Sequence, residues 1–458
     1  MDNNLTEKYN ILSDRRYLIP VLAIAMRVAS SSTADASYII LAIYAMLGRQ
    51  QVIQSLFLCW LFSMLNPMFA SKGGFAALGR YTIIISAALS ILYRSKFIKN
   101  HVIPIGLISL TLLLGVFLLL HTIIISSFVE ISLLKSISWL FAMITLLAAW
   151  NGLTRYEHVQ LEKQMFSGLI GVLLLSLPLL SSGLGYLGAG FMGIIGHPQS
   201  FGPTMSLLGA WLAGRALIER NYSWQKIGLL VICLVLIVLS ASRTAGLALF
   251  VGLIVSLYLI AFINPTHFRE IISRLTNGRI GVFLLVVGSF GLLLTPLLNS
   301  TIDKYLFSKA GGTTGIVNAA TISRGNAVDA MTSNILKYPL TGIGFGLPSN
   351  LNDLDVQYDP MFGIPIGSSI EKGVMPLAVM EELGIPGFLF VCIWFLVLIK
   401  KGLYCGFAEL FVIITALTTN MGESTFFSAG GMGLLLINVV AWAATSKRTV
   451  INQENSYV

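Results

Sequence analysis

The chain has 458 residues, of which 56% are hydrophobic and only 11% are charged, and its net charge at pH 7 is +9. Soluble globular domains carry about 25% charged residues, so this composition excludes a water-soluble protein of this length. The positive charge does not indicate nucleic-acid binding, because the lysines and arginines are dispersed between apolar runs, as the topology signals of membrane proteins are.

Apolar runs recur from one end of the sequence to the other. A helix needs about 20 mainly apolar residues to cross a hydrocarbon core of about 30 Å. We therefore predict an all-α polytopic integral membrane protein with about 12 to 14 transmembrane helices and one long outer-face loop. The runs occupy residues 17–31, 36–48, 51–67, 78–93, 102–126, 133–150, 165–182, 201–218, 227–241, 244–263, 280–298, 376–399, 403–419 and 428–445.

The runs and the polar segments between them divide the chain. Residues 1–16 lack the basic region, short apolar stretch and cleavage site of a signal peptide and are interpreted as a cytoplasmic tail. An N-terminal transmembrane bundle is expected over 17–298 and C-terminal transmembrane helices over 376–445, followed by a cytoplasmic tail at 446–458. Residues 299–375 form the only long polar segment, and loops of this length are usually functional or disordered.

The distribution of lysine and arginine predicts the orientation. These residues are more frequent in alternate connections between the runs, which places both termini in the cytoplasm. The same topology places the long polar segment, the glycine-rich stretch 185–203 and Arg243 on the outer face. Polar features that are far apart in the sequence are therefore expected on one side of the membrane.

The stretch "LSASRTAGLALF" places Arg243 where one apolar run ends and the next begins. An arginine near a helix end often extends to the lipid headgroups, which is the simplest interpretation. Ser242 and Thr244 beside it are small and polar and suit close packing between helices. A fixed cation in a tight junction also suits an anionic ligand, so Arg243 is a candidate anion-binding residue.

Within the long polar segment, apolar residues follow the spacing of a short amphipathic helix, for which Ser323 or Asn326 would be the N-cap. Arg324 would then lie near a helix N-terminus, where backbone N–H groups and a guanidinium together suit a phosphate oxygen. A solvated loop arginine is the alternative. The following "TGIGFG" lacks the Lys-Ser/Thr of a P-loop and follows no predicted strand, so a tight turn back to the membrane is expected.

Three carboxylates, Glu371, Glu381 and Glu382, occur where the long segment returns to the membrane. Glu381 and Glu382 lie inside a predicted helix whose first turn holds Pro376. Intramembrane carboxylates usually face a cavity or a charged partner, so these two are candidate supporting residues of a site. A buried Glu–Arg pair that only holds helices together is the alternative.

His197, in "GHPQSFGP", is the one histidine that the predicted topology places with the outer polar features. Lone histidines are more often structural than catalytic, and both roles stay open. No second histidine or cysteine stands at ligand spacing, which argues against a zinc site. Asp353 and Asp355 resemble a metal clamp only weakly. We therefore expect no metal and no cofactor.

The order of these pieces resembles the O-antigen polymerase and O-antigen ligase superfamily of bacterial polysaccharide enzymes. The similarity lies in "SASRTAGLAL" at the start of a span, in "SRGNAVDAM" and "NILKYPLTGIGFG" within a long outer loop, and in "LAVMEELGIPGFL" in the helix that follows. It covers roughly residues 190–400 of the chain.

The resemblance implies a GT-C-like membrane glycosyltransferase that is metal-independent and inverting. Such an enzyme polymerises undecaprenyl-diphosphate-linked oligosaccharide repeat units into O-antigen, capsular polysaccharide or exopolysaccharide on the outer face of the bacterial inner membrane. By motif match, Arg243 and Arg324 would hold the diphosphate, with Ser242 and Thr244 in support. The implied partners are the lipid-linked glycan, membrane lipid, a flippase and a chain-length regulator. No nucleic-acid partner is expected.

One departure separates the chain from the ligases of that superfamily, which share a His-Asn pair just before the helix that follows the loop. Here the corresponding stretch reads "SSIEKGVMPL" and contains no histidine. Polymerisation is therefore favoured over transfer to lipid A-core, and Glu371 is the first candidate for the general base, ahead of His197. A lipid-linked glycan flippase or another transporter is the remaining alternative, for which discontinuous helices or repeated halves would be typical.

Overall fold

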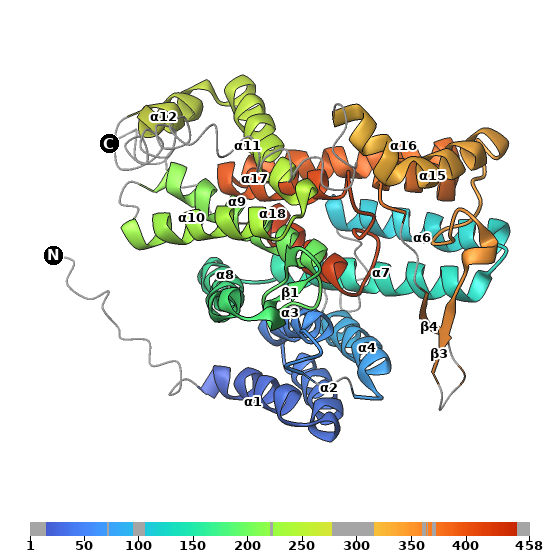
Figure 1. Cartoon of the computed structure of the whole chain (residues 1–458), viewed down its shortest axis with the longest axis horizontal. Coiled ribbons are helices and arrows are strands. Elements are labelled where there is room, and N and C mark those ends of the chain that lie inside the picture. Colours follow the sequence, from blue (N-terminus) through green and yellow to red (C-terminus); the bar gives the residue numbers. More distant parts are fainter. Residues whose placement is uncertain are drawn as a thin grey trace.

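The computed structural model describes residues 15–70, 73–94, 106–219, 223–276, 316–359, 363, 365–368 and 372–446. Within these residues the protein is predominantly helical, and most of its helices run alongside one another (Figure 1). The α-helices are α1 (Arg15–Ala29), α2 (Ser31–Ala45), α3 (Arg49–Met64), α4 (Ala76–Arg94), α6 (Leu107–Ile125), α7 (Val129–Asn151), α8 (Arg155–Ser176), α9 (Pro198–Ile218), α10 (Trp224–Leu239), α11 (Arg243–Ile263), α12 (Pro265–Thr276), α15 (Ile316–Lys337), α16 (Met375–Cys405), α17 (Phe407–Thr419) and α18 (Met432–Thr445).

Short elements complete the fold. Two antiparallel strand pairs are present, β1 (Tyr186–Leu187) with β2 (Gly190–Phe191), and β3 (Val356–Tyr358) with β4 (Pro365–Ser368). The 3₁₀ turns are η1 (Leu177–Ser181), η2 (Gly183–Gly185) and η3 (Leu351–Asp353). Within the described residues, the all-α prediction is therefore corrected only by these two small hairpins, both in connections between helices.

Six of the described helices are long and apolar enough to cross a membrane, namely α4, α6, α7, α8 with η1, α11 and α16. Four further apolar helices are shorter and lie in α1, α10, α17 and α18. The predicted class, an α-helical membrane protein, is confirmed at this level. The count of about 12 to 14 spans stays a prediction, because several predicted runs form short helices and the run at 280–298 lies outside the described residues.

Local sequence signals explain where several helices begin. Thr154 caps α8 by accepting the backbone N–H of Glu157, and the Glu157 carboxylate accepts the N–H of Thr154 in return. This reciprocal capping box satisfies two backbone donors that have no partner inside the helix. Ser30 and Thr33 form the same arrangement at α2. Pro198 and Pro376 occupy the first turns of α9 and α16, where a missing N–H costs little.

Successive long helices of the bundle run in opposite directions, so the bundle has two ends (Figure 1). We call the end at which α4, α7, α9, α11, α16 and α18 begin the Arg243 end, and the other the Arg215 end. At the Arg215 end, Arg49 donates to the carbonyl oxygen of Gly152 at 3.1 Å, and Arg94 donates to that of Leu47 at 2.9 Å. The two guanidiniums therefore lie at the C-terminal ends of α7 and α2, where they interact favourably with the helix dipoles.

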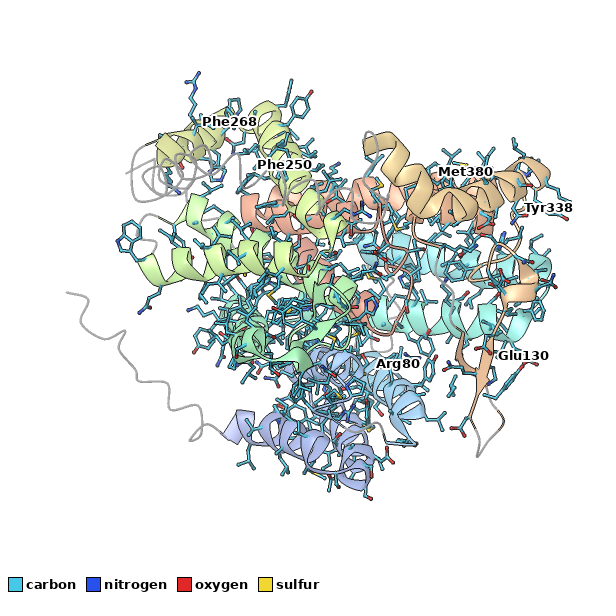
Figure 2. All side chains as sticks on the ribbon, viewed as in Figure 1. Arg80, Glu130, Phe250, Phe268, Tyr338 and Met380 are labelled. Atoms are coloured by element: carbon cyan, nitrogen blue, oxygen red, sulfur yellow. The ribbon has the colours of Figure 1, made fainter. Side chains whose placement is uncertain are left out.

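Three helices form the centre of the bundle. Nearly every side chain of α9, α17 and α18 is buried, and side chains of the surrounding helices fill the space around them (Figure 2). With 13 residues, α17 is about 20 Å long, which is less than the roughly 30 Å of a hydrocarbon core. Residues 420–431, here called the central loop, connect α17 to α18 at the Arg243 end.

The central loop is irregular backbone held by its own polar groups. The side-chain oxygen of Asn420 accepts the backbone N–H groups of Thr425 and Phe426, at 3.0 and 2.9 Å. Phe426 and Phe427 are buried against Trp394 of α16. Irregular backbone at membrane depth is tolerated where protein surrounds it or where it lines a cavity. The central loop is therefore irregular backbone that packs against neighbouring helices at the Arg243 end.

Helix α16 is interrupted at Gly384, which has a φ of +69°. In a continuous helix the N–H of Ile385 would bind the carbonyl of Glu381, but here it donates to Pro339 at 2.8 Å. The carbonyls of Glu381 and Glu382 instead accept the N–H groups of Ile343 and Gly344. The loop 339–346 thus satisfies the backbone groups that the interruption releases.

The long polar segment differs from its prediction. It contains α15, which begins at Ile316 and spans 22 residues, in place of a short amphipathic helix capped by Ser323 or Asn326. Both residues lie inside α15. The tight turn expected at "TGIGFG" is present, with positive φ angles at Gly342, Gly344 and Gly346. Most of both predicted tails, 1–16 and 446–458, lies outside the described residues.

Replacement of Gly384 by alanine should destabilise the protein. A Cβ at this position would overlap the carbonyl of Leu340, and the left-handed backbone costs an L residue roughly 1–2 kcal/mol by itself. We expect Gly384→Ala to lower the apparent free energy of unfolding in detergent by more than that amount.

Gly171→Ala is the matched control, because Gly171 lies inside α8 and a Cβ there meets no atom within 4 Å. This change should be neutral or stabilising, since alanine favours helix over glycine by about 0.5–1 kcal/mol. Equal effects of the two changes would contradict the account of the α16 interruption.

Candidate functional site

The turn between α10 and α11, residues 239–244, is here called the arginine junction. α10 ends at Leu239, and α11 begins at Arg243 with Ser242 as its N-cap residue. Between them Ala241 has a φ of +54°, a conformation that is rare outside glycine. The prediction that Arg243 begins a long apolar helix after a very tight junction is confirmed.

Close backbone approaches hold the arginine junction against its neighbours. A Cβ at Gly202 of α9 would overlap Ser242, and a Cβ at Gly190 of β2 would overlap the carbonyl of Ser240. On another side, a Cβ at Gly422 of the central loop would overlap the methyl group of Thr244. The close packing expected of Ser242 and Thr244 is therefore present, and it surrounds half-buried Arg243 with rigid elements.

His197 is the N-cap residue of α9 and lies at the same end of the bundle. Its neighbour Pro198 packs against Gly190, which also contacts the arginine junction. The exposed imidazole accepts the backbone N–H of Gln199 through Nδ1 at 3.2 Å. In the neutral ring this leaves the proton on Nε2, so His197 is suited to donate a hydrogen bond outward. Action as a general base through Nε2 would require loss of the cap.

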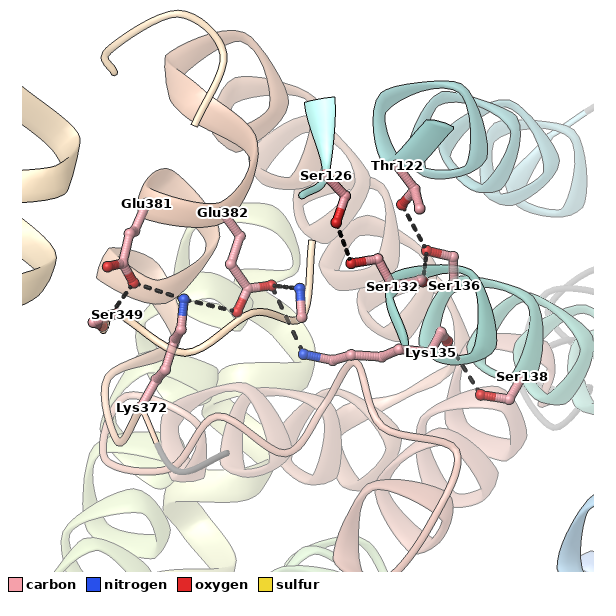
Figure 3. A network of polar contacts seen from close by, with 11 residues as sticks. Thr122, Ser126, Ser132, Lys135, Ser136, Ser138, Ser349, Lys372, Glu381 and Glu382 are labelled. Atoms are coloured by element: carbon pink, nitrogen blue, oxygen red, sulfur yellow. Dashed lines mark hydrogen bonds and ion pairs between the residues drawn. The ribbon is translucent and has the colours of Figure 1, made fainter. Parts of the chain in front are cut away.

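Glu381 is at the centre of a buried polar network at the Arg243 end (Figure 3). Its side chain is 0% exposed and pairs with Lys372 Nζ at 2.6 Å. Asn334 of α15 donates to Oε1 at 2.7 Å, and Ser349 donates to Oε2 at 3.1 Å. Every contact therefore joins α16 to the returning polar segment.

Glu382 extends this network toward α7. Its carboxylate pairs with Lys372 at 3.2 Å and with Lys135 at 3.7 Å, and it accepts the N–H of Gly346 at 2.7 Å (Figure 3). Lys135 Nζ also lies 4.9 Å from the ring centroid of Phe345. We call Lys135, Lys372, Glu381 and Glu382 the carboxylate cluster; its two cations and two anions balance.

The carboxylate cluster agrees in part with the alternative of a buried Glu–Arg pair that holds helices together. Glu381 and Glu382 do have buried cationic partners, but these are lysines instead of the expected arginine. Lys372 contacts both carboxylates, so it fastens the end of the long polar segment to the start of α16. The N–H of Met375 donates to the carbonyl of Asn420 at 3.1 Å, which joins the same region to the central loop.

The structure does not describe the side chains of two predicted site residues, Arg324 and Glu371. Arg324 lies in the interior of α15, more than two turns after its first residue, so the predicted position at a helix N-terminus is wrong. The side chain of Arg324 lies outside the described residues, as does Glu371. The proposed roles of both stay predictions, and Glu371 is adjacent in sequence to the anchored Lys372.

A second buried charge cluster lies at the Arg215 end. Arg215 of α9 pairs with Glu162 of α8 at 2.7 Å and with Glu409 of α17 at 2.8 Å, and all three side chains are at most 5% exposed. Trp211 donates to Glu162 at 3.0 Å. Arg215 is one of the lysines and arginines whose distribution predicted the orientation, and neither it nor the two acids was predicted as a site residue, because the pairing joins positions far apart in the chain.

Lys372, Lys135 and Arg80 at the Arg243 end were also not predicted as site residues. For Lys372 the signal was its place beside Glu371 in a stretch that precedes an acidic helix. Lys135 lies within an apolar run, where intramembrane charge is itself informative. In the described part of the chain, no group of three or more His, Cys, Asp or Glu residues is arranged to hold a metal ion.

No protein-family model matches the chain, and no curated protein matches its sequence.

Removal of the Lys372 cation should be strongly destabilising. Lys372→Met leaves two buried carboxylates with less compensation, and breaking a buried ion pair typically costs about 3–5 kcal/mol. We expect a decrease of this order in the apparent free energy of unfolding in detergent. Combination with Glu381→Gln should reduce the loss, because fewer buried charges are then unpaired.

Lys226→Met is the matched control, because Lys226 pairs with Glu219 at 2.8 Å but both side chains are well exposed. Exposed pairs contribute about 0–1 kcal/mol. If Lys372→Met cost no more than Lys226→Met, the carboxylate cluster would not be the strut described above.

Proposed function

We propose that the protein is a membrane glycosyltransferase of GT-C-like architecture. It polymerises undecaprenyl-diphosphate-linked oligosaccharide repeat units into O-antigen, capsular polysaccharide or exopolysaccharide at the outer face of the bacterial inner membrane. The observation that carries the proposal is the gathering of the arginine junction, His197 and the carboxylate cluster at one end of a bundle of apolar helices.

A lipid-linked diphosphate donor suits this end of the molecule. Its polyprenyl chain stays in the bilayer, so the diphosphate lies at the membrane surface, level with the ends of the helices. Arg243 stands at the first position of α11, where backbone N–H groups at the start of the helix can also bind an anion. The Nε2 of His197 supplies a further hydrogen-bond donor at the same end.

The glycosyl transfer depends on stabilisation of the charge on the leaving diphosphate and needs no covalent intermediate with the protein. The acceptor hydroxyl oxygen forms a bond to the anomeric carbon while the bond to the diphosphate oxygen breaks, which inverts the anomeric centre. Negative charge then develops on the departing undecaprenyl diphosphate, and permanently charged guanidiniums stabilise it without a metal. The proton of the acceptor hydroxyl passes to a carboxylate that acts as general base.

Glu371 is the proposed general base. Its neighbours in the chain are held on both sides, because the carbonyl of Ile366 in β4 accepts from the Tyr81 hydroxyl at 3.0 Å, and Lys372 is fastened by the carboxylate cluster. In this scheme Glu381 and Glu382 act as positioning residues through Lys372. Their carboxylates are buried and already neutralised, which makes them unsuited to proton transfer with the acceptor.

The experiments below also distinguish two alternative functions. Transfer of the glycan to lipid A-core would use the same donor site. A lipid-linked glycan flippase is favoured by one observation, the interruption of α16, since transporters often use broken helices. Against it, the loop 339–346 of the chain itself satisfies the released backbone groups, which leaves none of them to coordinate cargo.

Arg243→Ala should abolish polymer formation while the protein still folds. The loss of a guanidinium that stabilises the leaving diphosphate is expected to reduce the rate of chain extension by about 100-fold or more. The measurement is extension of a lipid-linked repeat unit by the purified protein, with transfer to lipid A-core and translocation across a vesicle membrane assayed in parallel.

Arg155→Ala is the matched control, because Arg155 opens α8 as Arg243 opens α11, but at the Arg215 end. It should leave extension unchanged. Full polymer length and yield with Arg243→Ala would contradict the proposal. Translocation without extension by the unmodified protein would identify a flippase instead.

A further inference from the structure

Arg80 is a cation at the Arg243 end that no predicted role includes. It lies in the first part of α4 and is labelled in Figure 2. Its Nη2 donates to the Tyr81 hydroxyl at 2.7 Å and makes a longer contact of 3.4 Å with the carbonyl of Ile366 in β4. Nη1 lies against Gly430 of the central loop, where a Cβ would overlap it.

The positive charge of Arg80 is not balanced within the described residues. Its Nε is buried and has no hydrogen-bond partner. No described carboxylate forms an ion pair with it, whereas Arg215 is held between two carboxylates and Arg274 pairs with Glu270. Its hydrogen-bond acceptors are a neutral hydroxyl and, at longer range, a carbonyl oxygen. Arg80 is thus a half-buried cation whose described contacts, including the Tyr81 ring centroid 4.6 Å from its Cζ, are all with neutral groups.

Such a position is less favourable for a cation than one that holds an anionic partner. Burial removes water from a guanidinium, and this loss is repaid only when an anion or sufficient acceptors replace the water. The same features make the position favourable for a bound anion.

The central loop links Arg80 to the arginine junction. Gly430 of the loop contacts the Arg80 guanidinium, and Gly422 of the loop contacts Thr244, the residue after Arg243. A side chain at Gly430 would cover the Arg80 guanidinium, and one at Gly422 would displace Thr244 beside Arg243. Two arginines from helices far apart in the sequence therefore flank one loop at one end of the bundle.

We propose that Arg80 binds a phosphate oxygen of the lipid-linked diphosphate donor, which makes it a second guanidinium for the anion that Arg243 contacts. This inference rests on the function proposed above and names a further residue of its donor site. A diphosphate has two phosphoryl groups and can engage two guanidiniums, each of which offers paired N–H donors. A monophosphate has only one.

The test measures binding of sugar-free undecaprenyl diphosphate and of undecaprenyl monophosphate to the purified full-length protein. Omission of the sugar separates phosphate recognition from any acidic sugar. A charge-assisted hydrogen bond contributes about 1.5–3 kcal/mol, so Arg80→Gln should raise the Kd for the diphosphate about tenfold or more, and that for the monophosphate by less. Arg80→Lys should recover part of the affinity.

A stability measurement distinguishes ligand binding from a structural role. Removal of a cation without an anionic partner should leave the unfolding midpoint of the ligand-free protein unchanged or raise it, while a structural arginine would lower it on removal. The matched control is Tyr81→Phe, which deletes the hydroxyl that contacts Arg80 but keeps the guanidinium. It should largely preserve diphosphate affinity.

Two results would overturn the inference in different ways. If Arg80→Gln kept full diphosphate affinity while Arg243→Gln lost it, the assignment of Arg80 would fall and the proposed function would stand. If the unmodified protein bound the diphosphate no more tightly than the monophosphate, both would fall together.

Discussion

The interruption of α16 at Gly384 is the constraint on which the rest of the Arg243 end depends. Hydrocarbon supplies no hydrogen bonds, so the backbone groups released there need partners within the protein. The loop 339–346 supplies them, and it approaches closely enough only because Gly342 and Gly384 lack side chains. This approach brings Ser349 and Gly346 to the carboxylates of Glu381 and Glu382, and so defines where the long segment returns.

The two ends of the bundle treat charge differently. At the Arg215 end one buried arginine is shared by two carboxylates, which ties three helices together. At the Arg243 end the carboxylate cluster is internally balanced, while Arg80 has no described anionic partner. An end with compensated acids and an uncompensated guanidinium is suited to an anion from outside the chain. In the function proposed above, the cluster supports the site and the arginines contact the ligand.

Sequence reasoning located some site residues better than others. Arg243, Ser242 and Thr244 were recognisable because a charge between two apolar runs marks a junction whatever the helices around it do. Arg324 was misplaced because the start of α15 was judged from amphipathic spacing, and the helix continues upstream to Ile316. The partners of Glu381 and Glu382 were expected to be arginine, since no local pattern indicates which cation reaches a carboxylate from another helix.

The sequence by itself determined the membrane class, the helical architecture and the gathering of polar features at one end, because composition and hydrophobic run length reflect the solvent that surrounds each segment. Only the tertiary structure decided how those features meet. The break at Gly384, the lysines of the carboxylate cluster and the contact of Arg80 with the central loop all depend on residues distant in the chain. Such contacts arise from packing and backbone hydrogen bonding, which no local pattern in the sequence encodes.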